Sequence, residues 1–423
     1  QAKTERILFL LMRHLYTGML YVFSWLAPAF KWTSRKYAKW LSVRNQWEVD
    51  LKHFERKAGV PLVWFHCASV GEFEQARPVI DVLAAKQPVQ IAVSFFSPSG
   101  YEAKKTFKHA DVITYLPIDI PSRVNRFLDL LKPTVAVFVK YELWFNFMHM
   151  IHSRGIAMAL MSAHFPHKHW STQWPGIHLG IQLAQFDRVF AQTEVSCSRL
   201  QSVGIYNCVC VGDTRVDRVI DVAEKSFESV VLASYAKASK VLVVGSNWPE
   251  DDLHLIPVLK SLKHFNIIVA PHELSNDQKK RWLDAFKGEI QTLADFEEGQ
   301  EETTRVVYVD QIGFLSKLYR FADVAYIGGG FGKAVHNTLE AAVYGIPVIF
   351  GPKNQRFVEI QALKEIGAGI EIMSGKELSE KLNKALDDQA YRDEVSSALK
   401  DFFTSHSGAS KKVLKWIEEV VKS

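Results

Sequence analysis

The stretch that decides the fold is "WFHCASVGEFEQARPVI", which spans Trp64–Ile80. It continues the apolar run "VPLVWFHCA", typical of a buried strand, and its second half has the spacing of a helix. Between the two lies "SVGE", in which small residues precede a single carboxylate, Glu72. Because Pro78 is disfavoured deep in a helix, we expect the regular helix to start or restart close to it. Gly71 and Glu72 would then lie in or near a loop, at the ligand-binding edge of a parallel sheet.

The alternation of apolar strand and helix continues along the whole chain. In the first half, further strands are expected in "VQIAVSFF", "ADVITYLPID", "PTVAVFVKYELW", "IAMALMSA" and "RVFAQT", and "NCVCVGDTRVDRV" ends this half. In the second half, they are expected in "KVLVVGSNWPEDD", "NIIVAPHEL", "TRVVYVDQIG", "ADVAYIGGGFG" and "IPVIFGP". Strands that alternate with helices at this spacing predict parallel, doubly wound α/β sheets.

The length and composition indicate a globular protein of more than one domain. A chain of 423 residues is too long for a single core. Hydrophobic residues make up 48% and charged residues 23%, which are ordinary globular values. We therefore predict a first segment of residues 1–50, a Rossmann-like domain of residues 51–225 and a second one of residues 226–423. Two such domains would face a cleft, where small-molecule sites are common.

The first fifty residues have the features of a membrane-binding segment. The apolar stretch 7–30 is interrupted mainly by Arg13 and His14, and its longest uncharged run, 15–30, is shorter than the roughly 20 residues that a spanning helix needs. The stretch 31–44 then carries five basic residues and no acidic one.

Three interpretations of this segment compete. A cleaved signal peptide lacks a suitable small-residue cleavage site, and a soluble core helix remains an alternative. We favour a membrane-bound helix, either spanning or lying in the interface. The basic residues would hold that side in the cytoplasm, with anionic headgroups rather than nucleic acid as their partner.

The cysteines and histidines do not form a recognisable metal motif. None of the four cysteines belongs to a Cys-x-x-Cys pair, so we expect free thiols, with a metal site or a disulfide as the alternatives. The loop "HFPHKHW" at His164–Trp170 holds three histidines. A metal site, a polar loop that meets an anionic acceptor and an ordinary loop all remain open for it.

The glycine-rich stretch "IGGGFGKAVHNTLEAAVYGIPVIFGP" at Ile327–Pro352 is the strongest local signal. Four of its glycines, at positions 328, 329, 330 and 332, would let the backbone approach a ligand. We expect a helix from about 336 to 344, whose N-terminus suits a phosphate. Asn337 and Glu340 would share a face, Glu340 would bind ribose hydroxyls and Lys333 would neutralise phosphate charge. A glycine turn with a capping asparagine remains the alternative.

Other polar residues also follow expected strands, each with a structural alternative. Ser246 and Asn247 could bind phosphate or cap a helix. Lys140 and Glu142 lie two apart, so on a strand they would share a face and form a salt bridge. Arg215 lies between Asp213 and Asp217 and could pair with either one.

Five of these segments, in this order, resemble the motifs of one enzyme family. They are "HCASVGEFEQARPVI", "KYELW", "GDTRVDRV", "GSNWPEDD" and "GGGFGKAVHNTLEAAVYGIPVIFGP". Together they resemble the 3-deoxy-D-manno-octulosonic acid (Kdo) transferases. The resemblance implies a GT-B glycosyltransferase on the cytoplasmic face of the inner membrane, with the lipid A precursor bound by the first domain and the donor CMP-Kdo by the second. It also implies inversion at the anomeric carbon and neither a metal nor a cofactor.

The resemblance also implies roles for single residues. The catalytic base falls on Glu72, and two positions that support the transition state fall on Lys140 and Arg215. Together with Ser246 and Lys333 from the loops above, the expected donor-binding residues are Pro271, His272, Ile312, Gly313, Phe314, Asn337, Thr338, Leu339 and Glu340.

The chain departs from the family pattern at several of these positions. Lys140 replaces the first acid of a Glu-x-Glu-Leu-Trp motif, so Glu142 is expected to inherit its role. Pro271 stands where many members have an arginine, which removes a phosphate-binding cation. Another GT-B enzyme with a different nucleotide sugar, or a membrane-anchored nucleotide-binding module, remain the alternative functions.

Overall fold

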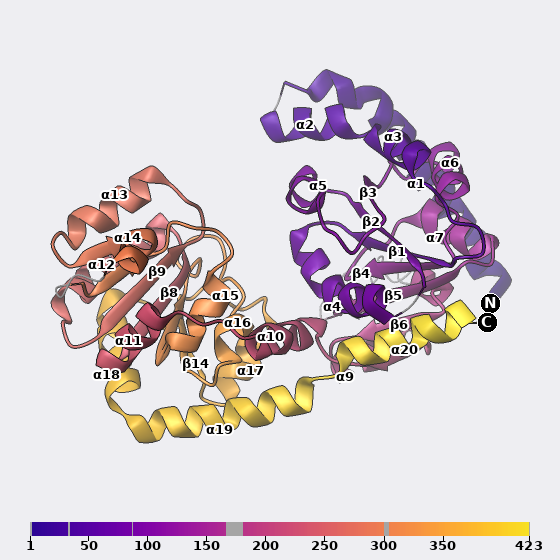
Figure 1. Cartoon of the computed structure of the whole chain (residues 1–423). Helices are drawn as coiled ribbons and strands as arrows, with labels where there is room; N and C mark the ends of the chain where they lie inside the picture. The colour runs from indigo at the N-terminus through magenta and orange to yellow at the C-terminus, as the bar shows by residue number, and fades with distance from the viewer. Residues whose placement is uncertain (1, 33, 87, 166–180, 300–303, 423) are drawn as a thin grey trace. The chain divides into compact units, whose positions relative to one another are not determined.

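The computed structural model describes residues 2–32, 34–86, 88–165, 181–299 and 304–422. The chain forms two compact units (Figure 1), one of Gln1–Arg218 with Ser407–Ser423 and one of Val219–His406. Each unit contains one parallel seven-stranded sheet. This confirms the predicted α/β class.

The sheet of the first unit has the strand order β3-β2-β1-β4-β5-β6-β7. The strands are β1 (Leu62–Cys67), β2 (Gln90–Phe95), β3 (Val112–Tyr115), β4 (Val135–Val139), β5 (Ala157–Ala163), β6 (Arg188–Ala191) and β7 (Cys208–Cys210). The helices are α1 (Ala2–Leu26), η1 (Ala27–Phe30), α2 (Arg35–Val43), α3 (Gln46–His53), α4 (Val70–Lys86), α5 (Pro98–Lys104), α6 (Pro121–Leu131), α7 (Phe145–Ser153), η3 (Ile181–Gln185), α9 (Glu194–Ser202), α10 (Thr214–Glu224) and α20 (Ala409–Lys422).

The central strand β1 shows why apolar runs predicted this sheet. It pairs in parallel with β2 and β4, with Trp64 opposite Ala92 and Ala136. All six of its residues are buried. Helices cover both faces, so alternate residues pack into different cores: Trp64 with Phe127 and Phe147, and Phe65 with the core that contains Phe73. A strand buried on both faces reads as a continuous apolar run.

The sheet of the second unit has the order β10-β11-β9-β8-β12-β13-β14. Its strands are β8 (Val241–Asn247), β9 (Asn266–Pro271), β10 (Ile290–Thr292), β11 (Val306–Tyr308), β12 (Val324–Ile327), β13 (Val348–Phe350) and β14 (Gly369–Glu371). The helices are α11 (Val230–Ala238), α12 (Pro249–Ser261), α13 (Asn276–Ala285), α14 (Leu293–Glu298), α15 (Leu315–Leu318), η4 (Tyr319–Phe321), α16 (Leu339–Ala342), α17 (Val358–Glu365), α18 (Gly375–Asp387) and α19 (Gln389–His406).

The two edge strands of this sheet, β10 and β14, were not predicted. Each has three residues, all of them only partly buried. Because such short edge strands bury little surface, the sequence carries no apolar run that would indicate them.

The last helix differs from the expected domain ranges, which assigned all of 226–423 to the second domain. Helix α20 (yellow in Figure 1) belongs to the first unit, where Val413 and Ile417 join the core that contains Phe73. Asp217 of α10 accepts hydrogen bonds from the backbone N–H groups of Gly408 (2.6 Å) and Ser410 (2.6 Å). The contact between α20 and the first unit depends on the apolar face of α20 and on the Asp217 carboxylate. These are almost two hundred residues apart, so the spacing of residues in the sequence does not predict that they meet.

Helix α1 has one docked face. The ring of Tyr16 packs against Phe145 with centroids 4.7 Å apart and a tilt of 32°, and Asn146 donates to Thr17 Oγ1 at 3.0 Å. Buried Asp119 accepts the backbone N–H groups of Asn146 and Phe147 at the start of α7. Burial raises the pKa of Asp119 to about 6, although the nearby charge of Arg13 lowers it. Arg13, which interrupts the apolar stretch 7–30, therefore lies near the buried acid Asp119.

The other face of α1 carries apolar side chains that are exposed to solvent, among them Trp25 at 81% and Leu15 at 67%. No helix in the described ranges is both long enough and apolar enough to span a bilayer.

The basic stretch 31–44 presents fewer surface cations than expected. Arg44 is buried, and its guanidinium donates to the carbonyls of Leu116 (2.8 Å) and Phe96 (3.2 Å). Burial lowers the pKa of Arg44 to about 9. Lys39 lies 3.8 Å from Glu102. Arg44 therefore anchors the end of α2 to the sheet and does not contribute to a membrane-facing patch.

The expectation of four free cysteines is wrong. The structure joins Cys197 of α9 and Cys208 of β7 in a disulfide, with Cα atoms 5.6 Å apart. Cys67 and Cys210 are free. The pairing arises because α9 packs beside the strand that follows it, a tertiary proximity that the spacing does not reveal. His167 and His169 of the predicted histidine loop lie outside the described residues.

The Asp217 contacts give a first testable expectation. Replacing Asp217 by Ala removes two charge-assisted hydrogen bonds, which costs about 1–3 kcal/mol of stability. We expect faster amide hydrogen exchange throughout α20, measured by mass spectrometry of the intact chain. The matched control is S229A, which removes the cap of α11 in the other unit, where Ser229 Oγ accepts from Leu232 N–H. Unchanged exchange in α20 of D217A would show that the contact does not hold the helix.

Candidate functional site

Glu72 lies at the carboxyl edge of the first sheet, in the first turn of α4. The helix begins at Val70 and contains Pro78, so the expectation that the regular helix starts or restarts close to Pro78 is wrong, although Glu72 does lie near the loop that precedes the helix. The backbone N–H of Phe73 already donates to the carbonyl of Ser69 (3.1 Å), and Pro78 in the third turn removes only its own hydrogen bond. The Glu72 carboxylate is partly exposed and accepts a hydrogen bond from Ser69 Oγ.

Lys140 and Glu142 follow β4, which ends at Val139. Lys140 adopts φ 68°, a left-handed conformation unusual for a residue with a side chain. The two residues therefore do not lie on one strand, and the expected salt bridge between them is not formed in the described structure. Glu142 instead accepts from Trp144 Nε1 at 2.6 Å and lies 3.3 Å from His66 Nε2.

His66 connects Glu142 to the interior of the unit. It is fully buried, and its Nδ1 lies 2.8 Å from Ser94 Oγ, which also accepts from Trp64 Nε1 at 2.8 Å. Since Trp64 occupies an acceptor position of Ser94, the serine proton is free to donate to His66 Nδ1, which leaves His66 Nε2–H to donate to Glu142. This chain fixes the orientation of the Glu142 carboxylate.

The buried thiol of Cys67, the last residue of β1, lies near both carboxylates, and their charges affect its pKa. Burial raises its pKa well above the ordinary value, and the charges of Glu72 and Glu142 raise it further. Both acids therefore lie close to the end of β1.

Arg215 reaches the same edge from the start of α10. Its backbone N–H (2.9 Å) and its guanidinium Nη2 (2.6 Å) both donate to Asp213, which confirms the alternative of local pairing. The preceding Thr214 is buried and donates to the carbonyl of Gln75 on α4 at 2.6 Å. Helix α10 is thus attached to the helix that carries Glu72.

In the second unit, the helix after the glycine-rich loop is much shorter than expected. Helix α16 spans only Leu339–Ala342, and Asn337 Oδ1 accepts from Leu339 N–H at 3.3 Å. Asn337 precedes this helix, so the two residues do not share a helix face as expected, but Asn337 Nδ2 donates to Glu340 Oε1 at 3.0 Å. Thr338 and Leu339 are both fully buried, so neither side chain lies at the surface of the unit.

The glycines of this loop have a structural reason that the sequence did not reveal. A Cβ on Gly328 would lie 2.4 Å from the Cα of Asn247, and one on Gly330 would lie 2.5 Å from the backbone N of Gly351. The close approach is therefore between segments of the protein backbone. The alternative of a structural glycine turn explains these two positions without a ligand.

Asp251, in the first turn of α12, holds the loop in place. Its carboxylate accepts from Tyr326 Oη (2.9 Å), Gly329 N–H (2.8 Å) and Trp248 N–H (2.8 Å). Asp251 thus fills the capping role that was considered for Ser246 and Asn247. Ser246 has φ 52°, another left-handed residue at a strand end.

Three aromatic rings meet at the ends of β8, β9 and β12. His272 stacks on Trp248 with centroids 4.5 Å apart and on His336 with centroids 4.2 Å apart. Lys333 Nζ lies 5.6 Å from the centroid of the Trp248 ring. His272 and Lys333, both predicted donor-binding residues, are brought together here, with Pro271 as the residue that ends β9.

The other predicted donor-binding segment, Ile312–Phe314, shows mainly backbone features. Ile312 is 86% exposed and Gly313 has φ 91°. Phe314 precedes α15 and packs edge-on against Phe227, with centroids 6.3 Å apart.

Sequence reasoning missed His66, Trp248 and His336. All three lie inside motifs that were recognised. His66 and Trp248 lie at or directly after the end of a strand, whereas His336 returns to the end of β12 only in the fold, where its backbone N–H donates to the carbonyl of Gly328. The sequence could therefore have indicated that His66 and Trp248 lie near the carboxyl edges of the sheets. It could not have indicated which neighbours the three rings contact.

Comparison with known proteins supports the resemblance. Residues 45–218 match the model of a family described as 3-deoxy-D-manno-octulosonic-acid transferase (kdotransferase). The chain is 26% identical over 381 residues to a 3-deoxy-D-manno-octulosonic acid transferase of Haemophilus influenzae, covering 83% of this chain and 85% of that one. It is also 26% identical over 400 residues to the Bordetella pertussis transferase, covering 89% and 92%.

A third relative is larger. The chain is 25% identical over 313 residues to a bifunctional glycosyltransferase/methyltransferase of Fusobacterium nucleatum, covering 70% of this chain but 48% of that protein. The chain thus matches about half the length of this relative.

Solved structures show the fold. A UDP-GlcNAc 2-epimerase from Neisseria meningitidis has a TM-score of 0.57 and 15% identity, covering 85% of this chain and 99% of that one. Acinetobacter baumannii MurG has a TM-score of 0.54 and 14% identity, with the same coverage. These neighbours support the predicted GT-B class, although the expected cleft between the domains stays a prediction. The family match of residues 45–218 and the likeness to Kdo transferases along both units identify this chain as a glycosyltransferase related to the Kdo transferases.

Proposed function

We propose that this glycosyltransferase moves Kdo from CMP-Kdo to a hydroxyl of a lipid A precursor, with inversion at the anomeric carbon. The observation that carries the proposal is the match of the first unit to the Kdo transferase family, with Glu72 at the carboxyl edge of that unit's sheet. In open α/β sheets, this edge is where ligands bind.

In the proposed reaction, Glu72 acts as the general base. A sugar hydroxyl is a poor nucleophile at neutral pH, so a carboxylate must remove its proton as the new bond forms. The partly exposed Glu72 can be reached by an acceptor, and the hydrogen bond from Ser69 fixes its orientation. A single displacement with one base gives inversion and needs no covalent intermediate.

The leaving CMP gains negative charge on its phosphate, and cations are needed to stabilise it. We propose that Lys140 and Arg215 supply part of this charge, since both lie at the ends of strands of the first sheet. The pairing with Asp213 keeps the Arg215 guanidinium in one orientation. Glu142, oriented by His66 and Trp144, is the second acid of this edge.

The proposed donor site lies in the second unit, around His272, Lys333 and the pair Asn337–Glu340. The Glu340 carboxylate can accept ribose hydroxyls, and Asn337 holds it in place. The further proposal that no metal or cofactor takes part is tested by assay after treatment with a chelator.

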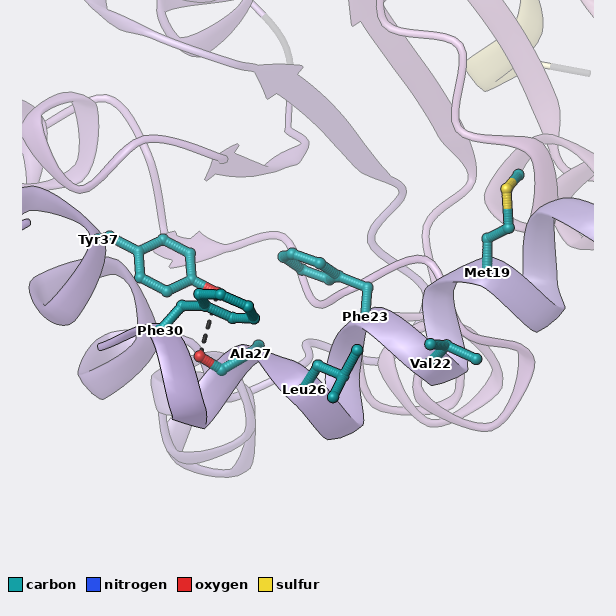
Figure 2. Close-up of a pocket in the computed structure, with 7 residues that line it drawn as sticks. All are labelled: Met19, Val22, Phe23, Leu26, Ala27, Phe30 and Tyr37. Carbon is teal, nitrogen blue, oxygen red and sulfur yellow. Dashed lines mark hydrogen bonds between the residues drawn. The ribbon is translucent and has the colours of Figure 1, made fainter. Parts of the chain in front are cut away.

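We also propose that α1 and η1 lie in the cytoplasmic surface of the inner membrane. An apolar groove of about 570 Å³ is lined by Met19, Val22, Phe23, Leu26, Ala27, Phe30 and Tyr37. Figure 2 shows six of these side chains along α1 and η1 and the seventh, Tyr37, on α2, where its hydroxyl donates to the carbonyl of Ala27 at 3.2 Å. The lining thus offers an apolar surface with its one hydroxyl satisfied, which suits acyl chains and not nucleic acid.

A GT-B enzyme that uses a UDP-sugar is the second candidate, because the fold neighbours include UDP-GlcNAc 2-epimerases. Those likenesses concern the fold alone, whereas the sequence similarity along both units is to Kdo transferases. Competition of the transfer reaction by CMP but not by UDP would favour the Kdo assignment.

The role of Glu72 leads to a specific expectation. E72Q should lower kcat for Kdo transfer by about 100-fold or more, because the amide cannot accept the acceptor proton. Binding of CMP, measured by calorimetry, should be unchanged. The matched control is E74Q in the same helix, where Glu74 pairs with Lys104 at 2.6 Å. Near-normal turnover of E72Q would remove Glu72 from the mechanism.

The membrane proposal is tested by sedimentation with phosphatidylglycerol vesicles. We expect the double variant W25E/W32E to bind at least about tenfold more weakly, because two exposed apolar anchors become charged. The matched control is Y206E, which changes an aromatic residue of the same unit that is 77% exposed and lies far along the chain from α1 and η1. Equal loss of binding in both proteins would argue against an anchor in α1 and η1.

A further inference from the structure

The three rings at the edge of the second sheet have an order that determines their chemistry. The ring planes of Trp248 and His336 are nearly parallel, with an interplanar angle of 12° and centroids 6.3 Å apart. Trp248 Nε1 lies 2.8 Å from His336 Nε2, so the two rings are joined edge to edge by a hydrogen bond. His272 covers both, tilted by 27° from Trp248 and by 20° from His336.

This hydrogen bond determines where the proton of His336 resides. An indole N–H can only donate, so His336 Nε2 must accept and carry no hydrogen. The neutral imidazole then has its hydrogen on Nδ1. A second proton would place two N–H groups against each other and break the bond. Nδ1 has no hydrogen-bond partner among the described residues, so its N–H is available to a ligand.

The surroundings also favour neutral rings. Burial and, second to it, the neighbouring His272 together lower the pKa of His336 to about 4. Burial lowers the pKa of His272 as well; Glu273 opposes this and Lys333 adds to it. At neutral pH, therefore, neither histidine carries the charge that an anionic ligand would need.

The charged groups around the rings come from four segments. Lys333 faces Trp248, Glu273 follows His272, Glu250 lies 3.6 Å from where a Cβ of Gly332 would stand, and Lys353 Nζ donates to the carbonyl of Gly332. Since Lys353 is bound to a backbone carbonyl, Lys333 is the cation placed against the ring system.

We infer that Trp248, His272 and His336 form a neutral aromatic platform that binds the donor nucleotide by stacking and by one N–H donor, and that Lys333 supplies the positive charge. The inference rests on the proposed function and deepens it. His272 is exposed, so its outer face is open to a heteroaromatic base. Lys333 would then supply the positive charge that an arginine provides where this chain has Pro271. Trp248 acts as a positioning residue through His336.

The protonation state can be observed directly, without any ligand. Long-range ¹H–¹⁵N spectra of the whole chain should show one histidine as the Nδ1–H tautomer that does not titrate between pH 7.5 and 5.5. Its signal should be absent in H336Q, which assigns it. In W248F, the tautomer should change or the ring should begin to titrate. A titrating or Nε2–H form of His336 in the unmodified protein would overturn the inference.

The same proton linkage predicts a difference in stability. Because the folded-state pKa of His336 is about 4 and the unfolded value is near 6.5, the unfolded chain binds the proton more tightly between these pH values. Stability therefore falls as pH decreases from 7 to 5. The thermal midpoint should fall less over this range in H336Q than in the unmodified protein. Equal falls would show that His336 is charged in the folded state.

Nucleotide binding separates a stacking role of His272 from a cationic one. With CMP as the probe at pH 7.5, H272A should weaken binding at least about tenfold, whereas H272F should weaken it less than about threefold, since base–aromatic stacking survives. K333M should weaken binding and reduce its dependence on salt. Equal losses in H272F and H272A would overturn the stacking role.

Different results would contradict the donor assignment and the aromatic platform. If the unmodified protein does not bind CMP, the donor assignment fails, whereas the spectra still decide whether the rings are neutral. If CMP binds but W248F and H272A bind it as well as the unmodified protein does, the donor assignment stands and the platform is wrong.

Discussion

The parallel pairing of the central strands is the constraint on which the rest of the structure depends. Strand β1 pairs with β2 and β4, and β8 pairs with β9 and β12, so each sheet reverses its strand order beside its central strand. Because all strands are parallel, their carboxyl ends meet at one edge. The residues that follow β1 and β4, such as Glu72 and Glu142, are therefore brought together although seventy positions separate them in the chain. The second sheet assembles Trp248, His272 and His336 in the same way.

At both edges, buried polar side chains hold the loops rigid. Asp251 accepts three hydrogen bonds, one from Trp248 before α12 and two from Tyr326 and Gly329 at the end of β12. His66 links Glu142 to Ser94 in the interior. The backbone is also unusual there, since Lys140 and Ser246 are left-handed. Strain of this kind persists only where the surroundings enforce it, and it gathers at functional sites. The proposed sites are thus built on a constrained framework and not on free loops.

The sequence predicted the long buried strands and missed features that depend on small or distant contacts. Strand β1 has six buried residues in a continuous, mainly apolar run, and its neighbour β2 has the same pattern of burial. By contrast, β10 and β14 have three residues each and bury little. Helix α4 starts before Pro78 because the tertiary packing of Phe73 and Val79 outweighs one lost hydrogen bond. Arg44 reads as a surface cation, yet two backbone carbonyls and the rings of Trp40 and Phe96 hold it inside.

The sequence by itself determined the α/β class, the order of the central strands along the chain and the position of Glu72 after a buried strand. These follow from local patterns, because periodicity and turn residues are properties of neighbouring positions. Only the tertiary structure decided that Asn337 and Glu340 follow a tight glycine turn with a four-residue helix, that Glu142 pairs with His66 rather than Lys140, and that α20 returns to the first unit. The physical reason is that hydrogen-bond partners and ring stacks join segments distant in sequence, whose proximity exists only once both sheets have formed.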